Sequence, residues 1–396
     1  MHWVVELGGG PRRVNHAGVA IGEAIYSFGG YCAEENAHIE EETTHKIPID
    51  VAVLNTQTYR WTRRPMPGCH LEQFYQTPYQ RYGHTVVAYK GCAYLWGGRS
   101  DAMGSCNTLY KYSPAEHRFQ ILHPEQPEEL IPGSRDGHSA CVYRDDMIIF
   151  GGYIDDDTAY GADVHAFHFP TRKWRELRTT GEPPSDRDFH TATVVGSRMY
   201  VFGGRSDEAS PVPFSHEYYC DRLKYLDLES LKWHEPQVSG TPPSGRRSHS
   251  TWECEGRLFL FGGYNGHTDT HYSDLYSFHP KSNRWEAVRP NGRGPCPRRR
   301  QVCIQMGPRL FLFGGTTPRY GPEGKAEEEE DLGLLDLDDL HVLDMEPSLF
   351  ALAARRVLDL GLPKFALPSS VRKELEWRSR PNHIPQLFSR DSQATG

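Results

Sequence analysis

Hydrophobic and polar residues alternate in a pattern that recurs along the chain and predicts short β-strands. Residues 190–204 (HTATVVGSRMYVFGG) predict one strand, a two-residue Gly-Ser turn and a second strand. Residues 223–233 (LKYLDLESLKW) predict two more strands around a polar turn. One unit of about 50 residues therefore contains four strands.

The second strand of each unit ends in an apolar residue followed by two glycines. The first glycine of each doublet is Gly29, Gly97, Gly151, Gly203, Gly262 or Gly314. Thirteen residues before it stands His16, His84, His138, His190, His249 or Gln301, and three residues earlier there is always an arginine. An aromatic residue follows the first five doublets, at Trp61, Phe119, Trp174, Trp233 and Trp285. This unit resembles the kelch repeat, which implies an all-β fold, a six-bladed kelch β-propeller over residues 1–345.

The last unit lacks its fourth strand. Residues 338–347 (DDLHVLDMEP) predict its third strand, but no tryptophan follows them. Trp3 stands ten residues before Arg13, close to the thirteen residues that separate Trp285 from Arg298. We therefore expect residues 2–7 to be the outer strand of the sixth blade, so that the two ends of the chain close the ring and leave no exposed edge.

The composition narrows the choice of partners. The 396 residues carry 44 Lys and Arg against 52 Asp and Glu, a formal net charge of −8, which argues against broad binding to nucleic acid or to a membrane surface. No apolar run is long enough to cross a bilayer, and the first residues lack the pattern of a signal peptide. The nine cysteines are scattered without a Cys-x-x-Cys pair, which favours reduced thiols and a cytoplasmic location, with the nucleus also possible.

The hairpin formed by the first two strands of a blade predicts where a ligand would bind. The residues that enter the first strand and leave the second lie on the same face, around the central channel. Blades four to six place basic and hydroxyl side chains there, namely Arg205, Arg247, Ser248, Tyr264, Arg299 and Arg300. Asp136 and Asp188 mark the other side. An arginine cluster on an acidic protein predicts an anion site, because guanidinium groups match carboxylate and phosphate geometry.

The repeated histidines invite a metal-site interpretation. One histidine per blade, at the same strand start, is spread around the ring and cannot converge on one ion, so a structural role is favoured. The sequence contains neither Gly-x-Ser-x-Gly nor His-Glu-x-x-His, and its Gly-Gly doublets follow strands without opening a helix. We expect no metal, no cofactor and no catalysis by this chain, and an oxidase or lyase propeller is the least favoured alternative.

From residue 346 the pattern becomes helical. Residues 348–362 have apolar residues at helical spacing, and a second short helix begins near Pro368. The first segment resembles the box that binds elongin C, through Leu349, Leu352, Ala353 (where Cys is more usual) and Val357. The second resembles the cullin-2 box, through Leu367, Pro368, Val371 and Leu375. We expect binding helices at residues 346–378 and a flexible tail at 379–396, although a helical pair that only caps the propeller remains an alternative.

Together, the propeller and the two boxes resemble the small kelch-type substrate receptors of cullin-2 RING E3 ubiquitin ligases. The resemblance implies a non-catalytic adaptor that binds elongin B, elongin C, cullin-2 and a RING-box protein. It also implies capture of proteins that end in glycine, with the terminal carboxylate at the arginine cluster and Arg, Lys or Gln favoured three residues before the final glycine. The residues expected near that upstream position are Asp136, Asp188, Tyr153 and Arg99.

Three questions stay open on the sequence alone. Residues 32–46 and 318–339 both follow Gly-Gly doublets and are expected on the pocket face, either to control access or as solvated loops without a role. The chain ends in Gln393-Ala-Thr-Gly396, the class of end that the pocket is expected to bind, so self-association through Gly396 is a hypothesis. The alternative to the adaptor is a kelch scaffold that binds internal motifs of cytoskeletal or chromatin partners.

Overall fold

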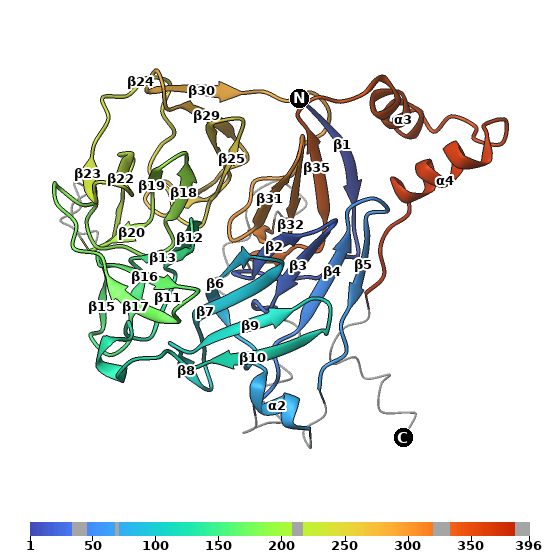
Figure 1. Cartoon of the computed structure of the whole chain (residues 1–396). Coiled ribbons are helices and arrows are strands. Elements are labelled where there is room, and N and C mark those ends of the chain that lie inside the picture. The colour runs from blue at the N-terminus through green and yellow to red at the C-terminus, as the bar shows by residue number, and fades with distance from the viewer. Residues whose placement is uncertain (34–45, 68–70, 208–216, 320–332, 385–396) are drawn as a thin grey trace.

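The computed structural model describes residues 1–33, 46–67, 71–207, 217–319 and 333–384. Six of its sheets, each built on four antiparallel strands, stand as blades around a central axis (Figure 1). The prediction of an all-β, six-bladed kelch propeller followed by short helices is confirmed.

The first three blades each contain four strands, which follow one another from the axis outward. Blade 1 consists of β2 (Ala17–Ile21), β3 (Ala24–Phe28), β4 (Val51–Asn55) and β5 (Arg60–Arg63). Blade 2 consists of β6 (Tyr82–Tyr89), β7 (Cys92–Ser100), β9 (Leu109–Ser113) and β10 (Arg118–Leu122). Blade 3 consists of β12 (Ser139–Tyr143), β13 (Asp146–Phe150), β16 (Val164–His168) and β17 (Lys173–Glu176).

The other three blades follow the same order. Blade 4 consists of β18 (Thr191–Val195), β19 (Arg198–Phe202), β22 (Lys224–Asp227) and β23 (Lys232–His234). Blade 5 consists of β25 (Ser250–Cys254), β26 (Arg257–Phe261), β29 (Leu275–His279) and β30 (Arg284–Val288). Blade 6 consists of β31 (Val302–Met306), β32 (Arg309–Phe313), β35 (Leu340–Asp344) and β1 (His2–Leu7).

The ring is closed at its centre and at its seam. The first strands of successive blades contact one another in the cyclic order β2, β6, β12, β18, β25, β31 and back to β2. At the seam, β1 pairs antiparallel with β35, with Leu7 opposite Leu340 and His2 opposite Asp344. Residues 2–7 are therefore the outer strand of blade 6, as predicted.

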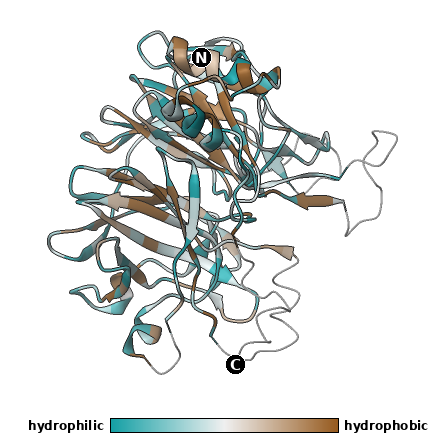
Figure 2. Ribbon diagram, turned by 90° about the vertical axis from the view of Figure 1, so that its right-hand side faces the viewer, coloured by the Kyte–Doolittle hydropathy of each residue, from teal (hydrophilic) through white to brown (hydrophobic). Residues whose placement is uncertain are grey.

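The core lies inside and between the blades. The second strand of every blade contains four consecutive buried residues. Figure 2 shows hydrophobic residues along several of the blade strands. Removing this apolar surface from water is the main contribution to the stability of such a fold.

The repeated polar residues are structural. In five blades the buried arginine donates from Nη1 to the carbonyl of its own first doublet glycine, at 2.8–3.2 Å. The repeat histidine reaches the preceding blade, as when His84 Nε2 lies 3.1 Å from the Phe28 carbonyl. The doublet leaves no room for side chains, because a Cβ on Gly98 would lie 2.6 Å from the Cβ of His84. The repeated residues thus make contacts that hold each blade and its neighbours together.

Short strands and helices complete the described chain. The short strands are β8 (Gly104–Ser105), β11 (Arg135–Asp136), β14 (Tyr153–Ile154), β15 (Ala159–Tyr160), β20 (Arg205–Ser206), β21 (Tyr218–Tyr219), β24 (Ser239–Gly240), β27 (Tyr264–Asn265), β28 (Thr270–His271), β33 (Thr316–Pro318) and β34 (Leu334–Asp336). The helices are α2 (Glu72–Gln76), the 3-10 helix η1 (Glu128–Leu130), α3 (Leu349–Asp359) and α4 (Ser369–Trp377). Within the described ranges, no helix has both the length and the apolar character needed to span a membrane.

Candidate functional site

A closed ring of backbone hydrogen bonds surrounds the propeller axis. Its members are the residues that directly precede the repeat histidine or glutamine, namely Asn15, Gly83, Gly137, Phe189, Ser248 and Arg300. Each N–H donates to the carbonyl of its counterpart in the preceding blade, at 2.8–3.3 Å, and Asn15 closes the circle onto Arg300. All six adopt positive φ angles, between 48° and 68°. The glycines at two of these positions are the only sequence signal for this ring, and the repeat spacing alone does not predict it.

A cavity of about 120 Å³ lies along the axis within this ring and is lined by the ring residues and by the repeat histidines and glutamine. The histidines hold fixed positions between blades, since Nε2 of His138, His190 and His249 lies 2.7–2.8 Å from a hydroxyl of the preceding blade. Burial lowers the pKa of His249 to about 3, so its ring is neutral. Among the described residues no group of three His, Cys, Asp or Glu side chains is placed to hold a metal ion.

The rim residues pair across each hairpin as the sequence predicts. The residue that enters the first strand lies opposite the residue that leaves the second, in the pairs Val14–Tyr31, Tyr82–Arg99, Asp136–Tyr153, Asp188–Arg205, Arg247–Tyr264 and Arg299–Thr316. The hairpins β14–β15, β20–β21, β27–β28 and β33–β34 begin at these positions. The predicted pocket residues therefore share one face of the propeller.

Arg247, Arg299 and Arg300 form the basic side of this face. Within the described residues, none of the three guanidinium groups has a hydrogen bond or an ion pair, and Nε of both Arg247 and Arg299 is buried without a partner. The Tyr264 ring centre lies 4.2 Å from Cζ of Arg299 and 5.6 Å from Cζ of Arg247. Burial, followed by the charges of Arg299 and Arg247, lowers the pKa of Arg300 to about 10. The charges of these three arginines oppose one another. Asp269 and Asp336 partly offset Arg299 and Arg300 from a distance, but among the described residues no carboxylate is paired with any of the three.

Arg205, which the sequence predicts as a ligand-binding residue beside these three arginines, differs from them because it has acidic partners. Its Nε and Nη2 donate to the two carboxylate oxygens of Asp188, at 3.1 and 2.7 Å, and Nη1 donates to Glu217 at 3.1 Å. The geometry satisfies both side chains, because a guanidinium and a carboxylate match in a two-bond contact. Arg205 and Asp188 are therefore partners of each other and are not free to hold a ligand in this arrangement.

Asp136 is the free carboxylate on the opposite side. It is 5% exposed, and its Oδ1 has no hydrogen-bond partner. Burial raises the pKa of Asp136 to about 7; Arg99 opposes the shift, and Asp188 reinforces it. Arg99 itself lies 3.7 Å from Asp155. Of the two predicted acidic residues, the structure thus leaves only Asp136 unpaired.

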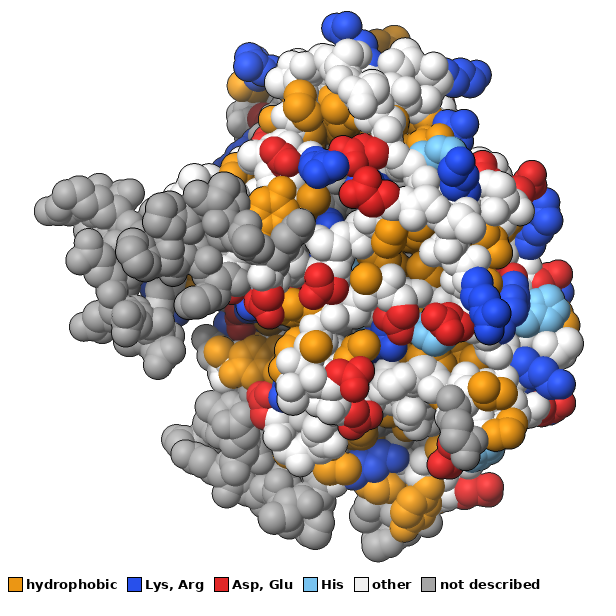
Figure 3. Space-filling view, turned by 90° about the vertical axis from the view of Figure 1, so that its left-hand side faces the viewer, with side chains coloured by type: hydrophobic (Ala, Val, Ile, Leu, Met, Phe, Trp, Pro, Cys, Tyr) orange, Lys and Arg blue, Asp and Glu red, His pale blue; other side chains and the backbone are white. Residues whose placement is uncertain are grey.

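Figure 3 shows acidic and basic side chains interspersed on the face that is turned toward the viewer. The other predicted pocket residues lie beside the cluster: Ser248 lines the axial cavity, Tyr264 donates to Asp269 at 2.9 Å, and Tyr153 packs edge-on to Tyr160 at 5.6 Å. His271, which lies outside the repeat positions and was not predicted, pairs with Tyr264 in the β27–β28 hairpin.

The C-terminal helices leave most of the predicted binding residues at the surface. Leu349 is 86% exposed, Ala353 and Pro368 are exposed, and Leu352, Val357, Leu367 and Val371 are partly buried. Phe365, between the helices, is 82% exposed, although the resemblance to the two boxes does not include it. Leu375 departs from the expectation, because it is only 1% exposed and offers no surface to a partner.

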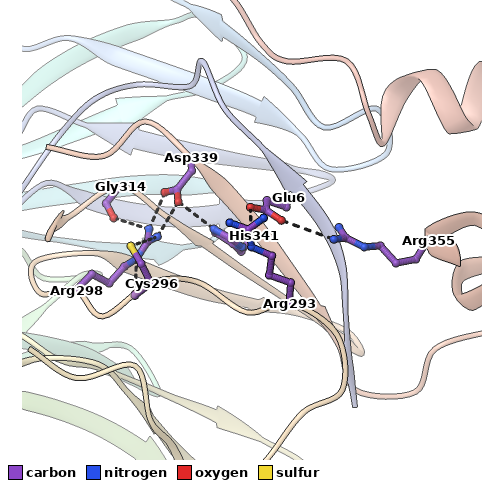
Figure 4. A network of polar contacts seen from close by, with 8 residues as sticks. All are labelled: Glu6, Arg293, Cys296, Arg298, Gly314, Asp339, His341 and Arg355. Atoms are coloured by element: carbon purple, nitrogen blue, oxygen red, sulfur yellow. Dashed lines mark hydrogen bonds and ion pairs between the residues drawn. The ribbon is translucent and has the colours of Figure 1, made fainter. Parts of the chain in front are cut away.

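The same helices are fixed to the propeller. Figure 4 shows Arg355 of α3 reaching Glu6 of β1, at 3.6 Å. After α4, buried Asn382 donates to the Tyr59 carbonyl at 3.1 Å and accepts from the Trp61 N–H at 3.0 Å. Arg60 donates to the carbonyls of Glu376 and Trp377, at 3.2 and 3.1 Å. The helices therefore do cap the edge of the propeller, and they still present an apolar surface outward.

Most of the two long segments and the end of the chain lie outside the described residues. The structure describes neither residues 34–45, residues 320–332, nor the tail 385–396 with Gly396. The expectations for loop control and for self-association through Gly396 stay predictions.

Comparison with known proteins also identifies kelch repeats in this chain. A family model described as the KLHDC2/KLHL20/DRC7 Kelch-repeats domain matches residues 83–315. Kelch domain-containing protein 3 of Homo sapiens is 43% identical over 376 residues, which cover 95% of either chain. Kelch domain-containing protein 2 of Bos taurus is 28% identical over 306 residues, which cover 71% of this chain and 70% of that protein.

Proposed function

This chain belongs to the kelch-repeat family that includes kelch domain-containing protein 3, and from this premise we propose that it is the substrate-recognition subunit of a cullin-2 RING E3 ubiquitin ligase. It binds proteins through a C-terminal glycine and presents them for ubiquitination. Kelch propellers generally act as non-catalytic binding scaffolds, and in this proposal the ligase chemistry belongs to the partner proteins.

The assignment of a terminal carboxylate as the ligand rests on one observation. Arg247, Arg299 and Arg300 converge on the pocket face without any acidic partner among the described residues, while their neighbour Arg205 is already paired. A free terminal carboxylate would supply the missing negative charge, and charge-assisted hydrogen bonds to it would be stronger than neutral ones. Ser248 adds a hydroxyl at the same level of the channel. Every chain end carries such a carboxylate, whereas an internal segment offers one only where it contains Asp or Glu, and amidation of a peptide's C-terminus distinguishes the two.

Asp136 supports the second part of the ligand. Its unpartnered Oδ1 lies on the rim opposite the arginines, in the β11–β14 pair with Tyr153. A basic side chain upstream of the terminal glycine would give this buried carboxylate its missing partner. We assign the upstream contact to Asp136, with Tyr153 and Arg99 beside it, in preference to Asp188, whose two oxygens already accept hydrogen bonds from Arg205.

The helices supply the link to the ligase. Leu349 and Phe365 are apolar and almost fully exposed, on a segment that Asn382 and Arg60 hold against the propeller. Exposed apolar surface of this kind commonly marks a protein-binding site. We assign it to elongin C through Leu349, Leu352, Ala353 and Val357, and assign cullin-2 to Leu367, Pro368 and Val371. Elongin B and the RING-box protein would join through these partners.

A pair of variants tests the proposed adaptor by removing its ligase-binding and its substrate-binding function one at a time. Leu349→Arg should abolish co-purification of elongin C and cullin-2 but leave binding of a glycine-ended substrate intact. Arg299→Gln should abolish binding of the glycine-ended substrate but leave co-purification of elongin C and cullin-2 intact. Leu71→Arg and Arg289→Gln make the same chemical changes at other exposed positions and should leave both activities unchanged. If Leu349→Arg retains its ligase partners, or Arg299→Gln retains its substrates, a scaffold for internal motifs would replace the proposal.

A further inference from the structure

His271 lies among the three unpaired arginines although it belongs to none of the repeat positions. It is on β28, opposite Tyr264 of β27, and the two ring centres are 4.6 Å apart. The same Tyr264 ring lies beneath the guanidinium groups of Arg299 and Arg247. The side chains of His271, Arg247 and Arg299 thus surround the ring of Tyr264.

The His271 side chain has an unused polar atom. Its Nε2 is buried and has no hydrogen-bond partner among the described residues. A buried imidazole nitrogen without a partner is costly, so such atoms commonly mark a position that water or a ligand completes. At Nε2 four of the repeat histidines differ, since that atom of His138, for example, reaches Thr85 in the preceding blade. Their Nδ1 atoms and both ring nitrogens of His16 are also buried without a partner, but unlike His271 these histidines do not lie among the arginines of the rim.

The charges around His271 keep it neutral while the pocket is empty. Burial and the charge of Arg299 are the main causes that lower the pKa of His271 to about 4; Asp269 opposes this shift, and Arg300 and Arg247 contribute to it. Tyr264 is the remaining titratable group against the ring, and it donates to Asp269. An arriving anion would offset the three arginines and thereby favour the protonated ring. By reciprocity, a proton on His271 would favour the bound anion to the same extent.

We propose that His271 is a further ligand-binding residue of this pocket, one that takes up a proton as a carboxylate-ended peptide binds and donates Nε2–H to it. The inference rests on the proposed function, since it requires that the arginines receive a carboxylate. The bond formed is a charge-assisted hydrogen bond, and the proton comes from solvent.

The size of the effect follows from the two protonation states. If the carboxylate returns His271 to the ordinary histidine pKa of about 6.5, the peptide should bind about tenfold more tightly at pH 5.5 than at pH 8. Binding at pH 5.5 should then take up about one proton per peptide.

The test is titration calorimetry of the full chain with an acetylated peptide ending in Ala-x-x-Gly as free acid, at pH 5.5 and pH 8. Buffers of contrasting ionisation enthalpy report the number of protons taken up. His271→Gln should lose this uptake and the pH dependence that accompanies it, and His267→Gln, an exposed histidine of the same hairpin, should keep both. Asp136 is present in every protein compared, so its own titration cancels between them.

The outcomes separate the two proposals. Binding of the acid with the same proton uptake in His271→Gln as in the unaltered chain overturns the role of His271 and leaves the proposed function standing. Binding without proton uptake by the unaltered chain does the same, whether or not the variant folds. No binding of the acid at either pH overturns both.

Discussion

The buried carboxylate of Asp136 is expected to lower the stability of the protein that carries it. Its side chain is 5% exposed, its Oδ1 has no partner, and Asp188 lies near enough to add repulsion. A binding site often holds a charge whose proper partner arrives only with the ligand. Asp136→Asn keeps the shape of the side chain and removes the charge, so it should stabilise the empty protein.

The magnitude follows from the pKa of Asp136, which burial raises from about 3.8 to about 7. At 1.36 kcal/mol per pKa unit, this difference corresponds to about 4 kcal/mol. The folded state holds the proton more strongly than the unfolded state, so the free energy of unfolding falls as pH rises from about 4 to about 7. We therefore expect Asp136→Asn to be more stable by up to about 4 kcal/mol at pH 8, with the gain vanishing near pH 4.

Urea unfolding of both proteins at pH 4, 6 and 8 measures this gain directly. Asp188→Asn is the matched control, because Asp188 is equally buried but paired with Arg205. Burial also raises the pKa of Asp188, but removing its charge leaves Arg205 without its two-bond partner, so Asp188→Asn should be less stable than Asp136→Asn at pH 8. The reasoning is refuted if Asp136→Asn is less stable than the unaltered protein at pH 8, or if its gain is the same at all three pH values.

Three further predictions concern the pocket and the helices. The preference for an Arg-x-x-Gly peptide over Ala-x-x-Gly should shrink between pH 8 and pH 6, as Asp136 gains its proton and loses its charge, and competition binding measures the ratio. Arg299→Gln should weaken binding of the free acid by at least tenfold without lowering Tm, because it removes one of three mutually repelling charges; a lowered Tm would show that the arginine is structural instead. Asn382→Ala should cost about 2 kcal/mol and lower the hydrogen-exchange protection of α4, since it deletes two buried hydrogen bonds; unchanged protection would contradict the anchoring role.

The fold could be predicted from the sequence because the repeated residues make the same packing contacts in each blade. The doublet glycines, the histidines and the arginines recur at fixed spacing because each blade needs the same close contacts, as Gly98 does against His84. The position of Trp3 likewise revealed the seam strand β1, since an outer strand needs an aromatic residue facing its neighbour. Periodic contacts of this kind leave a periodic signal.

The candidate site was predictable only in part because it is made of exceptions to the repeat. The spacing predicts the face that the rim residues share, but the pairs that they form follow only from the register of each hairpin. Asp188 and Arg205 lie opposite each other in one hairpin, and reading the rim as pairs would have predicted that they neutralise each other. Arg247 lies opposite Tyr264 and Arg299 lies opposite Thr316, so neither arginine has an acidic residue across its hairpin. His271 and the buried Leu375 depend on side-chain packing that no local spacing encodes.

Recognition of a terminal carboxylate is tested most directly by binding of one peptide ending in Arg-x-x-Gly, prepared as free acid and as C-terminal amide. It is best measured on the full chain and on the chain without residues 391–396, so that the Gln-x-x-Gly end of the protein cannot compete. We expect the acid to bind and amidation to weaken binding at least tenfold, about 1.4 kcal/mol. Equal binding of the two forms would contradict the carboxylate-binding role of Arg247, Arg299 and Arg300.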